Sequence, residues 1–591
     1  MTSPGGNGST SSSALKRYGP LIGIVVVLAV IAGVVVLSGG DSDTTDTATS
    51  DTAASGGSSS TDPTSAVDTP MTYAAAEAEG KAADTTWVDN CDPETGRIKL
   101  PTVYAPPCVP KFEGDNGGAT SPGVTADKIT VVSYTAPPNA DVTAALQGAA
   151  DDPPLVLETR KDFVSMLQET TETYGREVEV VEFEGTGPGD DAVAAQADAV
   201  NIVENYKPFM VLGGPAQTPV FAEEMARNKI ICVSCGLALP DQFTQDNAPY
   251  IWGITPSAEQ FLTNFTGYVV NSLNGRKAEF AGDPALQEQT RKFGVVHFEQ
   301  DPPVFSSLTE RLAECGAKQG YESAVTETYE FEIGKLPERA ATVIAKMKAE
   351  GVTTVMFLGD PLMPIYLTQQ ATAQDYHPEW VIAGTVFTDT TALGRLYDQG
   401  QWAHAFGVSN LSARTPREIS GAYQLHEWYF GRPPTAAKTA GVILPPLSLL
   451  FLGVQLAGPD LNPETFKAGL FKAPASGGGP TTPLISYGPD SGFKMIGDNC
   501  ELDAPRPDYY GIDDTTEIWW DAEATGVDEQ GKEGKGMWVY ANNAKRYGPG
   551  QMPVGESNAF VKDNTVMIYD AVPDEDKAPD YPPPAASSSG T

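Results

Sequence analysis

The sequence predicts an α/β protein in which parallel strands alternate with helices. Residues 209–240 carry the clearest evidence, because two short apolar runs, at 209–212 and 230–233, enclose a glycine turn and a stretch with helical periodicity. A strand, a turn, a helix and a second strand in that order form a parallel crossover. The same alternation restarts after residue 253, which indicates a second unit of the same kind.

The first unit is expected to place the ends of its parallel strands at one edge of a sheet. Sheets of this kind bind ligands in the loops outside the carboxyl ends of their strands. The loops at 213–218 and 234–240 are therefore candidate ligand contacts. The predicted strands are 129–132, 178–183, 209–212 and 230–233, and the predicted helices are 157–174, 190–206 and 217–228.

The second unit continues the alternation, and a helical section follows it. The helix at 440–456 is strongly apolar but short, and Pro445 and Pro446 interrupt it, so we expect a buried helix rather than a second membrane span. The predicted strands are 293–298, 324–329, 353–358 and 380–382, and the predicted helices are 260–273, 304–318, 336–349, 361–374, 417–430 and 440–456.

The N-terminal region is predicted to anchor the chain in a membrane. Residues 18–40 carry no charge and are long enough to span a bilayer. A Lys-Arg pair precedes them, so the positive-inside rule puts residues 1–17 in the cytoplasm and the bulk of the protein outside the cell membrane. A cleaved signal peptide is the alternative, because small residues follow the apolar stretch.

Two further segments have compositions that do not support a packed core. Residues 41–70 consist largely of Ser, Thr, Asp, Ala and Gly, which predicts a disordered linker. Residues 571–591 are rich in Pro and Ser, which predicts a disordered tail. Between linker and first unit, residues 71–122 form a lead-in segment rich in Cys and Pro.

The composition argues against several classes of function. The chain has 77 acidic and 38 basic residues and a formal net charge of −39, which disfavours a basic face for nucleic acid or for an anionic membrane. Its four histidines are scattered, and no G-x-S-x-G, P-loop or H-E-x-x-H pattern occurs. We therefore predict that the protein is not an enzyme, and we assign it no catalytic residue, metal site or cofactor.

Six cysteines in an exported chain suggest disulfides, and six allow about 15 connectivities. Cys91 and Cys108 flank a Pro-rich stretch that a local disulfide would order. Cys232 and Cys235 form a C-x-x-C, for which burial or a disulfide outweighs a redox role because Cys232 lies inside a predicted strand. If these two pairs form, Cys315 and Cys500 remain for each other.

Four short segments carry a resemblance to a known family. They are G-V-T-A-D-K-I at 123–129, V-L-G-G-P at 211–215, K-I-I-C-V-S-C-G at 229–236 and F-G-V-V at 293–296. With the topology of roughly residues 123–540, they are similar to the type I periplasmic solute-binding proteins, in particular the branched-chain amino acid (Leu/Ile/Val) binding proteins of ABC transporters. The resemblance implies two Rossmann-like lobes with parallel sheets, joined by three hinge crossovers, and a ligand in the cleft between them.

The resemblance also implies how the chain divides. It places crossovers near residue 255, near residue 411 and after about residue 478, and a C-terminal hairpin at 518–540. The expected parts are 123–255 and 412–478 for the first lobe, and 256–411 and 479–570 for the second lobe with its hairpin.

Matching the family's ligand loops to this sequence gives candidate site residues. In the second lobe the acidic residue that holds an α-ammonium in the family falls near Thr385, where no carboxylate stands, so Asp360 or Asp389 is the substitute. In the first lobe the Thr that the family has in the second ligand loop is absent. The candidate ligand-binding residues are Tyr134, Ala216, Gln217, Thr218, Gly236, Leu237, Ala238, Phe305, Asp360 and Thr385.

Each of these residue types also has a plain structural interpretation. Asp360 follows a strand end and is a natural cap for the next helix. The aromatic residues Tyr134, Phe305 and Phe387 are more often core than ligand contacts. The departures from the family pattern favour a ligand other than a standard branched-chain amino acid.

The sequence therefore predicts an extracytoplasmic, membrane-tethered solute-binding protein. It would capture a small polar or amphipathic molecule and deliver it to an ABC permease in the membrane. A ligand-sensing receptor or scaffold module with the same fold but no transport role is the alternative.

Overall fold

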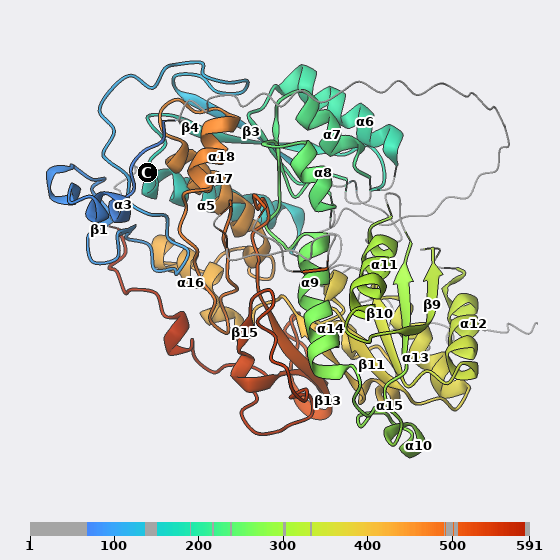
Figure 1. Ribbon diagram of the computed structural model, residues 1–591. Helices are drawn as coiled ribbons and strands as arrows, with labels where there is room; N and C mark the ends of the chain where they lie inside the picture. The colour runs from blue at the N-terminus through green and yellow to red at the C-terminus, as the bar shows by residue number, and fades with distance from the viewer. Residues whose placement is uncertain are drawn as a thin grey trace, which may run out of the picture.

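The computed structural model shows two α/β lobes (Figure 1). The predicted anchor at 18–40 lies outside the described residues, as does the predicted linker up to residue 67. The residues that the structure describes are 68–135, 137, 151–189, 191–215, 218–236, 239–299, 303–330, 332, 334–489, 491, 500–501 and 506–584.

The first lobe is built on a five-stranded sheet in the order β4-β3-β5-β6-β7, and every neighbouring pair is parallel. Successive residues of β5 point to opposite faces, as strand geometry requires, so Met210 and Leu212 enter one core and Val211 the other. The strands are β3 (Lys128–Thr135), β4 (Glu177–Glu184), β5 (Met210–Leu212), β6 (Ile231–Val233) and β7 (Ile251–Trp252).

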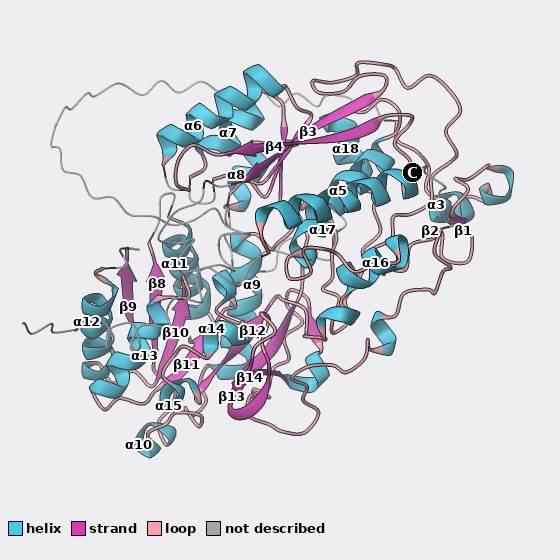
Figure 2. Cartoon of the chain, turned by 180° about the vertical axis from the view of Figure 1, so that it is seen from behind, coloured by secondary structure: helices cyan, strands magenta, loops and turns pink. Residues whose placement is uncertain are grey.

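Helices cover both faces of this sheet. One face packs against α5 and, from later in the chain, α16, α17 and α18, and the other face packs against α6 and α7. Figure 2 shows α5 and α17 side by side beneath this sheet, with α6 and α7 together on the far side of it. The helices are α5 (Pro153–Thr170), α6 (Ala192–Asn201), η3 (Ile202–Tyr206), α7 (Val220–Arg227), α8 (Asp241–Asp246), η6 (Arg417–Ile419), α16 (Gly421–Phe430), α17 (Ala440–Ala457) and α18 (Pro463–Leu470).

Helix α17 is the apolar helix for which the sequence left a membrane span as the alternative. Among the described residues it is the one helix that is long and apolar enough to cross a membrane, and 61% of its apolar window is buried inside the molecule. Leu447, Leu450 and Phe451 lie in the core of the first lobe. The structure thus uses α17 as a core helix.

The second lobe contains a larger sheet in the order β14-β13-β12-β11-β10-β8-β9, with β15 paired to β13. Strands β8 to β12 are parallel, whereas β13 pairs antiparallel with β12, β14 and β15. The strands are β8 (Phe293–Phe298), β9 (Ser323–Tyr329), β10 (Thr354–Leu358), β11 (Glu379–Ile382), β12 (Ala405–Ser409), β13 (Thr515–Val527), β14 (Glu533–Tyr540) and β15 (Arg546–Tyr547).

Helices again cover both faces. Val355 and Phe357 of β10 pack with α12 and α13, while Met356 and Leu358 pack on the side of α9 and α11. The helices of this lobe are α9 (Ala258–Tyr268), η4 (Val269–Leu273), α10 (Pro284–Gln287), α11 (Val304–Ala317), α12 (Leu336–Ala349), α13 (Met363–Ala373), η5 (Thr385–Phe387), α14 (Thr391–Gly394), α15 (Gln399–Trp402) and η7 (Ala541–Ala544).

Three segments connect the lobes. The first, 253–257, joins β7 to α9, and the second, 410–416, joins β12 to the helices of the first lobe. The sequence placed the third after about residue 478, but Tyr487, Tyr509 and Tyr510 still belong to the core of the first lobe, so the chain crosses at 511–514. These aromatic residues hold the intervening chain on the first lobe.

Buried side chains bind the crossovers to one another. The guanidinium of Arg546 donates to Leu411 O at 2.7 Å and to Asn410 O at 3.0 Å, and it pairs with Asp514 at 2.9 Å. This arginine therefore joins the second crossover to the third. Its side chain is 1% exposed.

The lead-in segment, 71–122, packs on the first lobe. It contains α3 (Tyr73–Ala78), η2 (Ala82–Asp84), β1 (Cys91–Asp92) and β2 (Arg97–Ile98). The Cys91–Cys108 disulfide closes its Pro-rich turn, and Ile98 and Leu100 enter the core of the first lobe. The structure also contains the disulfides Cys232–Cys235 and Cys315–Cys500.

The C-terminal segment corrects a prediction. The sequence predicted a disordered tail from residue 571, but the described part, up to residue 584, contains η8 (Asp574–Asp576) and packs against the protein. Asp576 is buried, and the Tyr581 hydroxyl donates to Asp92 at 2.7 Å. The compositional argument failed because hydrogen bonds of Asp576 and Tyr581, which composition does not predict, hold this Pro-rich segment on the protein.

Candidate ligand-binding site

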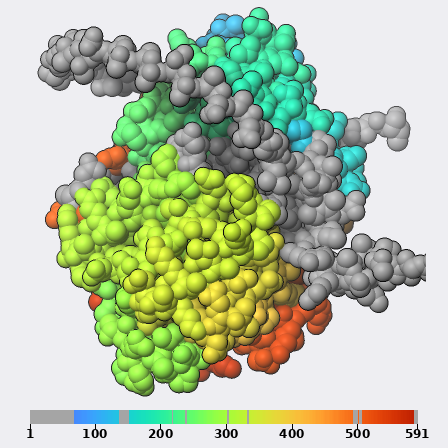
Figure 3. All heavy atoms as spheres, turned by 90° about the vertical axis from the view of Figure 1, so that its right-hand side faces the viewer, coloured from blue at the N-terminus to red at the C-terminus, as the bar shows by residue number. Residues whose placement is uncertain are grey.

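The carboxyl edges of the two sheets face each other across the crossovers. Strand β7 ends at the first crossover, which enters the second lobe, and β3, β5 and β6 are parallel to it. Strand β12 ends at the second crossover, which returns to the first lobe, and β8, β10 and β11 are parallel to it. Figure 3 shows the lobes as two masses, teal to green and yellow-green. The loops after these strands are the ones that face the opposite lobe.

In the first lobe the loop after β5 lies directly against the loop after β6. Gly213 has a φ of 80°, and a Cβ added to Gly214 would lie 3.0 Å from the carbonyl oxygen of Cys235. Only residues without a Cβ allow this approach. The predicted contacts Ala216, Gln217, Leu237 and Ala238 lie outside the described residues.

Ser234, directly after β6, has two features that single it out. Its φ is 55°, in the left-handed region that serine rarely adopts, and its buried Oγ has no hydrogen-bond partner among the described residues. Strained backbone and unpaired polar atoms concentrate at functional sites. Sequence reasoning marked the loop but not this residue, because the sequence alone shows neither the backbone conformation of Ser234 nor whether its hydroxyl finds a partner.

The flanking disulfide fixes the backbone on both sides of Ser234. Cys232 lies within β6 and Cys235 follows the strand end, and both are buried. Thr218 and Gly236, two predicted contacts, lie in the same region. Thr218 Oγ accepts a hydrogen bond from Val220 N at 3.4 Å, and a Cβ on Gly236 would meet the Leu239 side chain at 2.9 Å.

Tyr134, at the end of β3, packs within the first lobe. Its ring stacks on Phe183 and makes an edge contact with Phe221, and its hydroxyl donates to Asp198 Oδ2 at 2.9 Å. Burial and the Asp198 carboxylate raise the pKa of Tyr134 above its ordinary value. The hydroxyl thus already has an internal partner, as the core interpretation of this residue expects.

Phe305, on α11, is 3% exposed and belongs to the core between the sheet and helices of the second lobe. Its nearest aromatic partner is Phe298, at 6.0 Å between ring centroids. The structure therefore places this predicted contact in packing rather than in the loops.

Asp360 and Thr385 lie together and join the ends of three strands of the second lobe. Asp360 Oδ1 accepts from Leu362 N at 2.7 Å and from Met363 N at 3.1 Å, at the start of α13, and Tyr329 at the end of β9 donates to Oδ2. Thr385 Oγ accepts from Gly359 N at 3.2 Å. Burial raises the pKa of Asp360, and these hydrogen bonds oppose the shift. Asp360 therefore has the helix-capping role that the sequence offered as its alternative.

The loop after β11 contains strained backbone at the carboxyl edge of the second lobe. Val386 and Phe387 have φ values of 46° and 61°, and a β-branched residue in this region is a genuine outlier. Asp389 follows them and is buried. It accepts from the Ser409 hydroxyl through Oδ2, while Oδ1 has no partner among the described residues. Burial raises the pKa of Asp389 to about 7.

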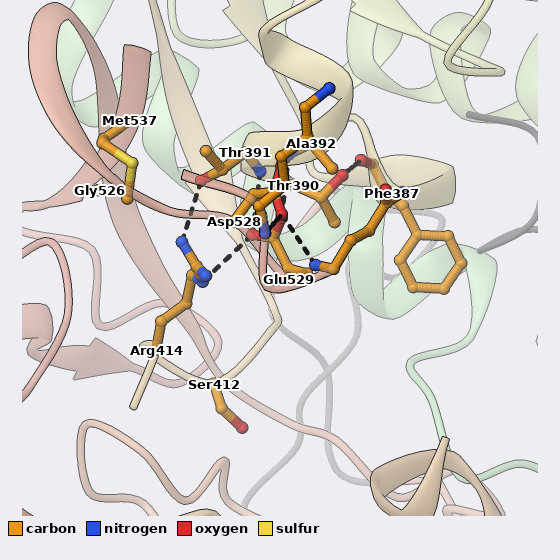
Figure 4. Close-up of polar contacts among 12 residues, drawn as sticks. Phe387, Thr390, Thr391, Ala392, Ser412, Arg414, Gly526, Asp528, Glu529 and Met537 are labelled. Carbon is orange, nitrogen blue, oxygen red and sulfur yellow. Dashed lines mark hydrogen bonds and ion pairs between the residues drawn. The ribbon is translucent and has the colours of Figure 1, made fainter. Parts of the chain in front are cut away.

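Glu529 anchors the far end of this loop (Figure 4). It lies on the turn between β13 and β14, and its carboxylate accepts from Thr391 N at 3.0 Å and Ala392 N at 2.9 Å, where α14 begins. Arg414, on the second crossover, lies 3.3 Å from Glu529 and 3.5 Å from Thr391 Oγ1. Figure 4 shows the Phe387 ring directed away from this cluster.

These contacts make the loop after β11 a structure held at both ends. Thr385 fixes it to the end of β10, and Glu529 fixes it to the hairpin and to the second crossover. Sequence reasoning missed Glu529, because it lies 138 residues from the loop that it anchors. A loop that is strained, anchored and at the carboxyl edge of a parallel sheet has the properties of a ligand-contacting loop.

Comparison with known proteins identifies one family. A sequence profile of the family described as "Periplasmic binding protein" matches residues 156–493, which is more than half of the 591-residue chain. No curated protein sequence matches the chain.

Several solved structures match at low sequence identity. One is an ABC transporter solute-binding protein from R. palustris in complex with 4-hydroxybenzoate, with a TM-score of 0.46 and 11% identity over 69% of this chain and 97% of that chain. A second is the branched-chain amino acid transporter substrate-binding protein LivJ from Streptococcus pneumoniae in complex with isoleucine, with a TM-score of 0.43 and 15% identity over 70% of this chain and 100% of that chain. A third is a Leu-, Ile-, Val-, Thr- and Ala-binding protein from Brucella ovis in a closed conformation, with a TM-score of 0.46 and 12% identity over 75% of this chain and 100% of that chain.

Proposed function

This chain belongs to the periplasmic binding protein family, and from that premise we propose that it captures a small molecule between its two lobes. The observation that supports this is the opposition of two parallel-sheet carboxyl edges across the crossovers. A ligand that contacts both lobes stabilises the closed arrangement by the difference between its affinities for the closed and open forms.

The polar groups available at the two edges bear on the ligand class. In the first lobe the Ser234 hydroxyl, which has no partner among the described residues, is available. In the second lobe the carboxylate of Asp360 is already used by α13 and by Tyr329. Thr385 stands at the position of the family's ammonium-binding acid, and Asp389, the other substitute, is buried and accepts from Ser409. We therefore propose a small polar or amphipathic ligand that is not a standard branched-chain amino acid.

We further propose that the protein serves an ABC importer from outside the cytoplasm. Membrane attachment would come from the apolar stretch at 18–40, and the permease would receive the ligand from the closed lobes. Support for this part comes from the family and from the sequence pattern of the N-terminus.

The test is ligand identification followed by a binding assay. Native mass spectrometry of the purified full-length chain would reveal a co-purifying small molecule, and thermal unfolding against a broad metabolite panel would rank ligands. A ligand at 100 times its Kd is expected to stabilise the protein by about 2.7 kcal/mol. If no compound co-purifies and none in the panel raises Tm, the proposed function is wrong.

The panel should separate the ligand classes. Leucine and isoleucine serve as the amino acid arm, and small carboxylates and neutral polar molecules serve as the other arms. Replacing Ser234 by Ala should lower the affinity for the true ligand. The matched change Ser323→Ala, on β9 of the second lobe, should leave that affinity unchanged. Tight binding of leucine would show that the proposed ligand class is wrong, while the proposal that the protein captures a small molecule would still hold.

A further inference from the structure

The C-terminal segment, residues 566–584, runs from one lobe to the other. The hairpin that precedes it belongs to the second lobe, yet Tyr581, near the end of the segment, is hydrogen-bonded to Trp428 of α16 and to Asp92 of the lead-in segment, both on the first lobe. The three crossovers already connect the lobes through the main chain. Beside the crossovers and the Cys315–Cys500 disulfide, this segment is thus a further connection between them, made by non-covalent contacts.

Its first anchor is in the second lobe. Val566 exchanges both backbone hydrogen bonds with Tyr540 of β14, at 2.8 and 3.1 Å. Tyr569 packs against the core of this lobe, and its hydroxyl donates to Asn543 O at 2.7 Å. The segment is therefore fixed to the second lobe before it leaves it.

Its middle is bound to the second crossover and to the turn at 479–482, which comes before the third crossover. Tyr569 N donates to Arg414 O, on the second crossover, at 2.8 Å. The buried carboxylate of Asp576 accepts from the backbone N–H and the hydroxyl of Thr481, each at 2.7 Å, and from the Thr482 hydroxyl. Gly479, in the same turn as these threonines, leaves room for the carboxylate, because an added Cβ would lie 1.9 Å from Asp576 Oδ1.

Its end is bound to the first lobe. Trp428, on α16, donates from Nε1 to Tyr581 O at 2.8 Å. The Tyr581 hydroxyl donates to Asp92 Oδ2 at 2.7 Å, on the disulfide-closed lead-in segment. The Tyr581 hydroxyl and the threonines on Asp576 are thus the contacts that the segment would have to stretch or break for the lobes to separate.

We infer that residues 566–584 act as a strap that limits how far the lobes open. The inference rests on the proposed function in one respect, because it takes the two lobes to move about the crossovers. A tether fixed at both ends and over the hinge narrows the range of lobe angles, and a smaller range lowers the conformational entropy that a bridging ligand must remove.

The test measures the distance between the lobes without any ligand. Val193 on α6 is 80% exposed, and Ala345 on α12 is exposed, so cysteines introduced at both positions carry spin labels for double electron–electron resonance on the full-length chain. The critical variant is Asp576→Asn. The matched control is Asp574→Asn, two residues away, whose carboxylate is 91% exposed and pairs only locally, with Lys577.

The Asp576→Asn protein should show a longer mean distance and a wider distribution than the Asp574→Asn protein and the unchanged chain. Deleting residues 571–591 should give a larger shift in the same direction. If the truncated chain does not fold, Tyr581→Phe, which removes one hydroxyl, takes its place beside Asp576→Asn. If the distance distributions of all variants coincide with that of the unchanged chain, the inference of a strap is wrong, even if Tm falls in a variant. Because no ligand is used, this outcome is independent of whether a ligand is ever found.

Discussion

Glu529 and Thr391 are 138 residues apart in the sequence, and the backbone N–H of Thr391 donates to Glu529 Oε1 at 3.0 Å. The same carboxylate accepts from Ala392 N and lies 3.3 Å from Arg414. One side chain on the hairpin turn therefore holds the loop after β11 against the second crossover. Through Arg414, this carboxylate is linked to the segment that joins the lobes.

Replacing Glu529 by Gln should loosen this loop. Gln keeps one acceptor oxygen but removes the second and the charge that faces Arg414, so the free energy of unfolding should fall by about 1–3 kcal/mol. Glu523→Gln, on the same hairpin with a side chain 84% exposed, is the control and should change stability by less than about 0.5 kcal/mol. Urea denaturation measures both. Equal effects of the two changes would show that Glu529 is only a surface residue.

Arg546 should be the most sensitive hinge residue. Replacing it by Met leaves the Asp514 carboxylate buried without its partner and two crossover carbonyls without a donor, at a cost of about 3–5 kcal/mol. Lys should not restore stability, because a single ammonium cannot reproduce the planar guanidinium fork. The double change Arg546→Met with Asp514→Asn should recover part of the loss in chemical denaturation, and a double variant no more stable than Arg546→Met would contradict this assignment.

Stability should fall as pH rises, because of the carboxyl pair Asp508 and Asp513. Gln260 donates to both, at 3.1 and 3.5 Å, and Ser486 donates to Asp513. Burial is the largest cause of the raised pKa of each, and for Asp513 the neighbouring Asp508 adds to it. An acid with a raised pKa in the folded state holds its proton there, so its contribution is complete below the unfolded pKa and is lost as pH rises through the folded pKa.

Asp513→Asn should remove part of that pH dependence. The amide mimics the protonated acid, so the slope of unfolding free energy should become less negative by up to about 1.4 kcal/mol per pH unit between about pH 5 and about pH 9. Other charged groups nearby, among them Asp514, Asp241, Glu259 and Arg506, remain in place. Thermal and urea unfolding at several pH values measure the slope. Asp246→Asn, on the exposed side of α8, is the control, and an unchanged slope in Asp513→Asn would refute the assignment.

Much of the fold was predictable because it depends on local periodicity. The predicted helix at 336–349 has the bounds of α12, and the strand at 293–298 has those of β8, since each shows its hydrophobic period without interruption. Strand β12 and helix α18 were not predicted. Strand β12 is five residues long and contains Gly407, and its assignment depends on pairing with β11 and β13.

The loops that form the candidate site could be predicted from the sequence, but the contacts of their side chains could not. Strand ends mark where the loops lie, so the region of Ser234 followed from the pattern, whereas the region of Thr385 followed from the family resemblance. The orientation of a side chain at a strand end is set by tertiary packing, which turned Tyr134 toward Asp198 and Asp360 toward α13. Anchors such as Glu529 are reached only through long-range contacts, and local patterns carry no information about them.

The disulfides should differ in their effect on stability according to the loops that they close. Cys232 and Cys235 are three positions apart, so the unfolded chain gains little freedom when this bond is removed, and the entropic effect is about 2 kcal/mol. Cys315 and Cys500 are 185 positions apart, for which the same chain-entropy relation gives about 5 kcal/mol. This disulfide also links the two lobes. Cys315 is on α11 in the second lobe, whereas Cys500 lies between Gly488 and Asp508, whose backbones pair with each other next to tyrosines in the core of the first lobe.

We therefore expect the double change of Cys315 and Cys500 to Ala to lower Tm more than the double change of Cys232 and Cys235 to Ala. The second double change should have the larger effect on ligand affinity, because it frees the backbone around Ser234. The opposite order in both measurements would show that the short disulfide, and not the long one, determines global stability.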